Sequence, residues 1–479
     1  MTTRAIARVA ACAAALITAA PAAAAGQWSA AADLGGARYV PVELGFTTGG
    51  DGVLALAPRG GAGGPVLQAT ISRSGGLGPL SALTRPDDML EFEKAGRGRQ
   101  LAVFGRNRVV ATGARGGRPW VAFGRIGQRL GRRRPLAVPG WSGGSLALAA
   151  NARGDVAVIS IGCGGCARTP LYVFYRPHGG RFGRAERVSG VAYEREEFGG
   201  VAPAVAVNAA GRVLVAWGRR SLGRGAPWPL YARIRHGRRW RGPSQRLGVL
   251  HEYGAITARL ANDDRAVVAW WTQHADAGGA GSGPLAPPTY HASTAGTSGR
   301  FGPARQLDAG VRGSDLAPGW PSFFPVTPNL HAAIAPSGRA RIAWTSADAD
   351  GAVVRVATIA DNTLTAVQTL GCGTLAALGT DGHDTAVALW ASATELHASL
   401  AEVGQPYAVP EQVEAGPPVV PGIAEVAVDP GTRRIAALWS TADPSSPGWV
   451  DAWRPRYAIR EPLSPPERTG RSTATRAAR

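Results

Sequence analysis

Aromatic and acidic side chains gather in several segments that separate the apolar runs of this chain. Aromatic faces stack on sugar rings and carboxylates accept hydrogen bonds from sugar hydroxyl groups, so such loops favour a carbohydrate ligand. Solvated loop surface is the simpler explanation for any single one of these residues, because loops are polar whatever they do. The candidate ligand-binding residues are Tyr193, Glu194, Glu197, His251, Glu252, Tyr253, Trp320 and Asp348.

Catalytic motifs do not accompany these residues. The sequence has no H-E-x-x-H metalloprotease motif and no P-loop. The adjacent carboxylates Glu196 and Glu197 would point to opposite sides of an extended chain, so they do not form the carboxylate pair of a glycosidase. No metal site and no cofactor are predicted. We therefore expect a binding protein rather than an enzyme.

The first 25 residues have the three parts of a secretory signal peptide. Arg4 and Arg8 precede an apolar core at residues 9–20, and small residues follow at 23–25. No later stretch reaches 18 consecutive apolar residues, so no membrane span is expected. The sequence thus predicts a secreted, extracellular or cell-envelope protein with a folded part at residues 26–463 and a disordered basic tail at 464–479.

Three cysteines remain after cleavage of this signal peptide. Cys163 and Cys166, separated by two glycines, are predicted to form a small local disulfide in an oxidising compartment. A zinc site needs about four ligands, and no second C-x-x-C or His pair accompanies this one. Cys372 is left over, either as a buried free thiol or as a link to another chain.

The net charge of +19 is concentrated in one half of the chain. Residues 26–250 carry 33 basic and 12 acidic side chains, whereas residues 251–479 carry 17 and 21. All basic residues except Lys94 are arginine, alongside abundant Ala and Gly, which is the codon bias of a GC-rich genome. An exported protein without aromatic residues interleaved among these arginines is not expected to bind nucleic acid.

An apolar strand, a short Gly, Asn or Asp turn and a second apolar strand, often ending in Ala-Trp, recur along the chain. Residues 204–217 are the clearest copy. Alternation of apolar residues around a tight turn predicts a β-hairpin. Each hairpin is followed by two further strand-like segments, and four antiparallel strands make one propeller blade. The expected centres of the eight second strands are Ala55, Ala111, Ala157, Ala216, Ala269, Ala343, Ala388 and Ala437.

The predicted fold is therefore all-β, a single β-propeller of eight four-stranded blades, with seven blades as the alternative. Residues 27–34 resemble a fourth segment without strands one to three before it. This segment could complete the last blade and close the ring, which removes exposed sheet edges, although residues 457–463 could fill that place instead. The repeated Trp217, Trp270 and Trp344 are expected to pack between neighbouring blades.

The topology sorts the loops into two faces. Turns between strands one and two and between strands three and four lie at one end of each blade, and the other connections lie at the opposite end. The first face receives arginines such as Arg153, Arg212 and Arg265 and is expected to be basic. The second receives the candidate ligand-binding residues and is expected to be acidic and aromatic.

The recurrent A-x-G-x-x-x-V-A-W hairpins, as at residues 210–217, resemble the degenerate repeats of exported bacterial β-propeller proteins of unassigned function, some of them loosely sialidase-like or WD40-like. The S-x-D-x-G-x-T-W boxes of sialidases and the Gly-His and Trp-Asp pairs of WD40 blades are absent. The resemblance implies a propeller and no particular activity. We expect a monomeric binding or scaffold module for an extracellular or cell-wall polymer or protein, with a glycan-active hydrolase or lyase using the acidic, aromatic loop face as the alternative.

Overall fold

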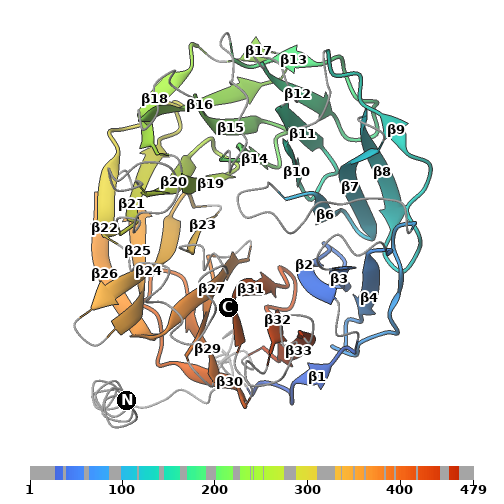
Figure 1. The fold of residues 1–479 in the computed structure, drawn as a ribbon, viewed down its shortest axis with the longest axis vertical. Helices are drawn as coiled ribbons and strands as arrows, with labels where there is room; N and C mark the ends of the chain where they lie inside the picture. Colours follow the sequence, from blue (N-terminus) through green and yellow to red (C-terminus); the bar gives the residue numbers. More distant parts are fainter. Residues whose placement is uncertain are drawn as a thin grey trace, which may run out of the picture.

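The protein forms a ring of eight antiparallel β-sheets around a central axis in a computed structural model (Figure 1). The described residues contain strands and no helix, so they include no helix that could cross a membrane. The predicted eight-bladed propeller is confirmed. The structure describes residues 27–462 apart from 36–38, 59–63, 86–98, 116–117, 140–144, 162–169, 190–200, 220–226, 238, 241, 252, 274–286, 310–328, 336, 349–350, 361–362, 382–383, 393–394, 417–418 and 443–452.

Each blade is a meander whose first strand lies nearest the axis, and the blades are numbered 1 to 8 along the chain (Figure 1). The eight first strands are β2 (Tyr39–Phe46), β6 (Leu101–Phe104), β10 (Ser145–Ala150), β14 (Ala204–Val207), β19 (Tyr253–Leu260), β23 (Leu330–Ile334), β27 (Thr374–Thr380) and β31 (Val419–Val428). The second strands are β3 (Gly52–Pro58), β7 (Arg108–Arg115), β11 (Val156–Ile161), β15 (Val213–Gly218), β20 (Ala266–Gln273), β24 (Ala340–Asp348), β28 (Ala386–Ala391) and β32 (Ile435–Thr441).

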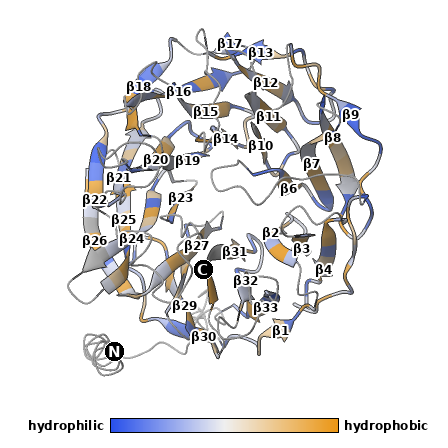
Figure 2. Cartoon of the chain, in the orientation of Figure 1, coloured by the Kyte–Doolittle hydropathy of each residue, from blue (hydrophilic) through white to orange (hydrophobic). Residues whose placement is uncertain are grey.

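The outer half of each blade is less regular. The third strands are β4 (Leu67–Ile71), β8 (Arg118–Arg125), β12 (Leu171–Arg176), β16 (Trp228–His236), β21 (Thr289–Ala295), β25 (Gly351–Ala360), β29 (Glu395–Ala401) and β33 (Arg454–Arg460). The outermost strands are β5 (Ser81–Ala82), β9 (Arg134–Pro135), β13 (Glu186–Arg187), β17 (Arg239–Trp240) with β18 (Gln245–Leu250), β22 (Arg305–Ala309), β26 (Thr363–Cys372), β30 (Glu411–Ala415) and β1 (Ala32–Asp33). Strands such as β13 and β17 carry hydrophilic residues toward solvent (Figure 2).

The second strands form the core because both of their faces pack against neighbouring blades. Every residue of β15, β20, β28 and β32 is buried. The tryptophan near the end of the strand packs onto the preceding blade, as Trp344 does against Trp271 and Tyr290 of blade 5. The predicted role of the repeated tryptophans in packing between blades is thus confirmed.

The turns between first and second strands join consecutive blades on one face of the ring. Asn151 Nδ2 donates a hydrogen bond of 2.5 Å to the carbonyl oxygen of Asn208, whose own Nδ2 donates at 2.9 Å to that of Ala261. The turns of blades 3 and 4 contain Gly154 and Gly211 at φ of 99° and 74°, in the left-handed region that favours glycine. The recurrent Asn side chain therefore links its turn to the turn of the next blade, and the recurrent Gly allows the left-handed backbone that the turn requires.

The N-terminal segment closes the ring. β1 pairs with β33 through Ala32 opposite Tyr457 and Asp33 opposite Arg456, and Trp28 forms a further bridge to Arg460. Residues 27–34 therefore provide the fourth strand of blade 8, as one of the two sequence alternatives predicted. The other alternative is wrong, because β33 is the third strand of that blade.

Cys372, the last residue of β26, is disulfide-bonded, so the expectation of a free thiol is wrong. The other cysteines of the chain, Cys12, Cys163 and Cys166, lie outside the described residues. The Cys163–Cys166 disulfide stays a prediction, as do the signal peptide at 1–25 and the basic tail at 464–479.

Candidate functional site on the propeller axis

The first strands place equivalent residues side by side around the axis. In blade 1 and blades 3 to 7 the last pairs before the turn have the same register, such as Phe46 opposite Gly52 and Ile334 opposite Ala340, and in blade 8 the turn is one residue longer, with Val428 opposite Ile435. The second and fourth residues before the turn share one side of the strand. The second residues are Gly45, Ala149, Ala206, Arg259, Ala333, Gly379 and Ala427, and the fourth are Glu43, Ala147, Ala204, Thr257, His331, Ala377 and Glu425.

Most of these residues are Gly or Ala because the strands converge near the axis. A Cβ atom added to Gly45 would lie 3.3 Å from the Cβ of Val103 in blade 2, and one added to Gly379 would lie 3.0 Å from the carbonyl oxygen of Val426. Against this background of small side chains, ionisable residues occupy only four of the fourteen positions. These are Glu43, Arg259, His331 and Glu425.

Glu43 forms an ion pair with Arg99, which directly precedes blade 2. Arg99 Nε donates a hydrogen bond of 2.6 Å to Glu43 Oε2, and Arg99 Nη2 donates to Glu43 Oε1. The Glu43 side chain is 1% exposed and that of Arg99 is 53% exposed. Burial raises the pKa of Glu43, and the charge and hydrogen bonds of Arg99 oppose that rise. We call Glu43, Arg99, Arg259, His331 and Glu425 the axial cluster.

The members of the axial cluster act on one another across the ring. Burial and the charge of Glu43 raise the pKa of Glu425 to about 7, against the opposing charges of Arg99 and Arg259. Arg259 belongs to blade 5 and Glu425 to blade 8, which are not neighbours. Their interaction therefore crosses the axis, and four blades together with the segment before blade 2 contribute to one electrostatic site.

Arg259 and His331 occupy the neighbouring blades 5 and 6. Burial, with repulsion from Arg99, lowers the pKa of Arg259 to about 10, and burial with the Arg259 charge lowers that of His331 to about 4. Arg259 is exposed to solvent although protein surrounds it, as expected for a side chain that projects toward the axis. At neutral pH the cluster thus contains two guanidinium groups, a neutral imidazole, the Glu43 carboxyl group paired with Arg99, and the Glu425 carboxyl group close to its pKa.

The loop residues proposed from the sequence are mostly beyond the described structure. Tyr193, Glu194, Glu197, Glu252 and Trp320 lie outside the described residues. Tyr253 begins β19, Asp348 ends β24, and the backbone N–H of half-buried His251 donates a hydrogen bond of 2.6 Å to Thr272 Oγ1. Their role as ligand-binding residues stays a prediction.

The axial cluster was missed because it becomes visible only when the repeats are aligned by their turns. Glu43, His331 and Glu425 each stand four residues before the first residue of a turn, where other blades have Ala or Thr. Read singly, each is one polar residue in an apolar run. The alignment of first strands is the signal that would have identified them.

Two other kinds of site receive little support. No group of three or more His, Cys, Asp or Glu side chains that could hold a metal ion occurs among the described residues. The expectation that the sequence lacks catalytic motifs is wrong at one place, because residues 140–144 have the spacing G-x-S-x-G with Ser142 at the nucleophile position; they lie outside the described structure. In hydrolases that motif joins a strand to a helix, and the described residues contain no helix.

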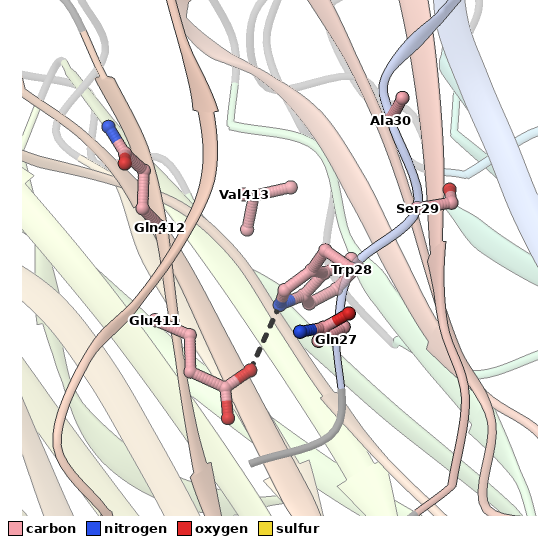
Figure 3. A pocket seen from close by; sticks show the side chains of 7 residues that line it. All are labelled: Gln27, Trp28, Ser29, Ala30, Glu411, Gln412 and Val413. Carbon is pink, nitrogen blue, oxygen red and sulfur yellow. Dashed lines mark hydrogen bonds between the residues drawn. The ribbon is translucent and has the colours of Figure 1, made fainter.

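A cavity of about 390 Å³ lies at the closure of blade 8 (Figure 3), beside β30 at the outer side of the ring (Figure 1). It is bordered by residues 27–30 of the N-terminal segment and residues 411–413 of blade 7. Trp28 Nε1 donates a hydrogen bond of 3.1 Å to Glu411 Oε2 inside it. Because Glu411 also accepts two bonds of 2.7 Å from Arg460, its carboxylate is already used in fastening the ring.

Comparison with known proteins assigns the chain to no family. No protein-family model matches the chain, and no curated protein matches it. A puromycin hydrolase is 18% identical with a TM-score of 0.44 over 88% of this chain, which spans only 62% of that protein. The BP39L lectin from Burkholderia pseudomallei is 14% identical with a TM-score of 0.44, covering 78% of this chain and 100% of the lectin. The Dos1 propeller is 10% identical with a TM-score of 0.47, covering 90% and 95%. This chain is a β-propeller repeat protein.

Proposed function

We propose that the protein is an exported binding module that holds part of an extracellular or cell-envelope ligand, such as a polysaccharide, at the axial cluster. The observation that carries this proposal is the convergence of four ionisable side chains at first-strand positions otherwise filled mainly by Gly and Ala, together with Arg99 from the segment before blade 2. A purely structural ring has no need for Glu425 and Arg259 there, because burial disfavours the charge of each.

The test is retention on a glycan array and on isolated cell wall. The Arg259→Ala/Glu425→Ala variant should lose retention. A matched control, Arg300→Ala/Glu402→Ala, removes one exposed charge of each sign away from the axis and should bind as the wild type does. Equal retention of both variants, or no retention of the wild type on either surface, would refute the proposal.

A second candidate is a glycan-active hydrolase or lyase, favoured by one observation. The pKa of Glu425 is raised to about 7, which suits a group that gives or takes a proton near neutral pH. An enzyme must release product, so screening against soluble polysaccharides separates the two functions. Activity that survives in Glu425→Gln would exclude this carboxyl group as the acid or base, and the loop residues Glu197, Glu252 and His251 would then be replaced first.

A further inference from the structure

Arg259 is the one cation of the axial cluster that has no carboxylate partner among the described residues. Its Nη1 donates to the carbonyl oxygen of Ala258 at 2.9 Å and to Thr257 Oγ1 at 3.3 Å, both on its own strand. Its Nε and Nη2 donate no hydrogen bond to any described residue. These two nitrogens form one edge of the guanidinium group, whose geometry matches both oxygens of a carboxylate.

The surrounding groups leave the charge of Arg259 largely uncompensated. Glu43 is already neutralised by its bidentate pair with Arg99. His331 is neutral at pH 7, and Glu425 makes no hydrogen bond or ion pair with a described residue. The guanidinium group is exposed to solvent, so a ligand on the axis can reach it.

We propose that Arg259 binds a carboxylate group of the ligand, and that this ligand is an acidic polysaccharide containing uronic acid. The inference rests on the proposed function and names the substrate class for the same site. The Nε and Nη2 groups donate two parallel hydrogen bonds to the carboxylate, which supplies the paired negative charge that no described residue supplies.

The composition of the cluster selects this class over other polyanions. A uronic acid offers one carboxylate together with several hydroxyl groups. Beside Arg259 the cluster offers Thr257, the neutral imidazole of His331 and the carboxyl group of Glu425, all of which can pair with hydroxyls. An acidic peptide or an inorganic polyphosphate brings negative charge without these hydroxyl groups, so it would leave Thr257, His331 and Glu425 without ligand partners.

Glu425 makes this binding dependent on pH. The charged and titratable groups that act on it are Glu43 on β2, Arg99 beside β6 and Arg259 on β19, and the charge of Arg259 acts in turn on His331 on β23. Below pH 7 the Glu425 carboxyl group is mostly protonated and leaves the charge of Arg259 available. Above pH 7 it ionises and competes with the ligand. Binding of a carboxylate should therefore weaken as the pH rises from 6 to 8.5.

The experiment is calorimetric titration with three uronate probes, the tetrasaccharides of galacturonate, guluronate and hyaluronan, and with carboxyl-reduced tetragalacturonate. At least one uronate probe should bind, and for a galacturonate ligand the reduced form should bind more weakly. Arg259→Met should lower the affinity about 10–100-fold, since a charge-assisted bidentate contact is lost. Arg259→Lys should recover only part of the lost affinity. The control Arg300→Met should bind with the affinity of the wild type. In Glu425→Gln the affinity should no longer fall above pH 7.

Each other outcome has a defined meaning. Binding of the neutral probe alone, with loss of affinity in Arg259→Ala/Glu425→Ala, would overturn the carboxylate inference and leave the axial binding site standing. Binding of a tetraglutamate peptide and of none of the uronate probes would show that the ligand is an acidic peptide and not an acidic polysaccharide. No binding of any uronate probe overturns the inference, and the cell-wall retention assay then decides separately whether the proposed function survives.

Discussion

At the scale of single residues, the Glu43–Arg99 pair is the part of the axial cluster with the clearest energetic consequence. Arg99→Met leaves a carboxylate that is 1% exposed without its two hydrogen bonds. We expect a loss of about 1–3 kcal/mol in the free energy of unfolding, measured by urea denaturation at pH 7, because a buried acceptor loses its partner.

The double variant Glu43→Gln/Arg99→Met is the control for this prediction. Removing both charges avoids the unpaired carboxylate, so the double variant should be more stable than Arg99→Met alone. If it were equally or less stable, the ion pair would not be what the single substitution disturbs.

Glu425 predicts a dependence of stability on pH. Its pKa is about 7 in the folded protein and 4.5 without the fold, so the folded state binds the proton more tightly. The resulting stabilisation is complete below pH 4.5 and is lost as the pH rises to 7. Glu425→Gln should therefore raise Tm relative to the wild type at pH 8.5 and leave it nearly unchanged at pH 4.5, as calorimetry can check. An equal difference at both pH values would contradict the assigned titration.

Residue-level predictions from the sequence succeeded where a repeat supported them. The tryptophans of the second strands could be assigned to the core because five copies occupy one position, and Trp344, Trp390 and Trp439 are indeed almost completely buried. The axial residues could not be assigned to a common site, because Glu43, Arg259 and His331 each depart from the repeat pattern in a single blade. Their significance depends on distances between blades, which a linear sequence does not contain.

At the scale of elements, each blade depends on its neighbour for a complete core. Trp344 on β24 is 0% exposed and packs against Trp271 and Tyr290 of the preceding blade. We expect Trp344→Ala to lower the free energy of unfolding by about 3–5 kcal/mol, the usual cost of removing a large buried aromatic side chain. Denaturant titration measures this loss.

Trp28→Ala is the matched control for Trp344→Ala. Trp28 is only partly buried at the closure of blade 8, so its replacement should cost clearly less. Equal losses would mean that packing between consecutive blades is not the main source of stability.

The inner two strands of each blade were predictable and the outer ones less so. All eight predicted centres of second strands, from Ala55 to Ala437, lie within second strands. Alternation and tight turns are strong local signals there. The outermost strand of blade 3, β13, is only two residues long, because an outer strand pairs with a neighbour along one edge only and needs little regular pairing.

At the scale of the whole molecule, the ring is held closed by one short N-terminal segment. Deleting residues 27–34 removes the pairing of β1 with β33 and the hydrogen bond from Trp28 to Glu411. The outer edge of β33 then exposes unpaired backbone groups, which favour association with another chain. We expect a lower Tm and concentration-dependent oligomers in size-exclusion chromatography. A monomeric variant with unchanged Tm would show that closure adds nothing to the stability of the ring.

We expect the seam between β1 and β33 to form last during folding. The hydrogen bond from Ile459 N to Ser29 Oγ joins residues separated by 430 positions, which is close to the full length of the folded part of the chain. Each doubling of loop length adds only about 0.6 kcal/mol to the closure cost, and the intervening blades hold the two ends together once formed. The last strand pairing therefore waits for the rest of the ring. Until then, β1 of another copy can pair with the vacant edge of β33. Refolding at high protein concentration should therefore divert some molecules into domain-swapped dimers.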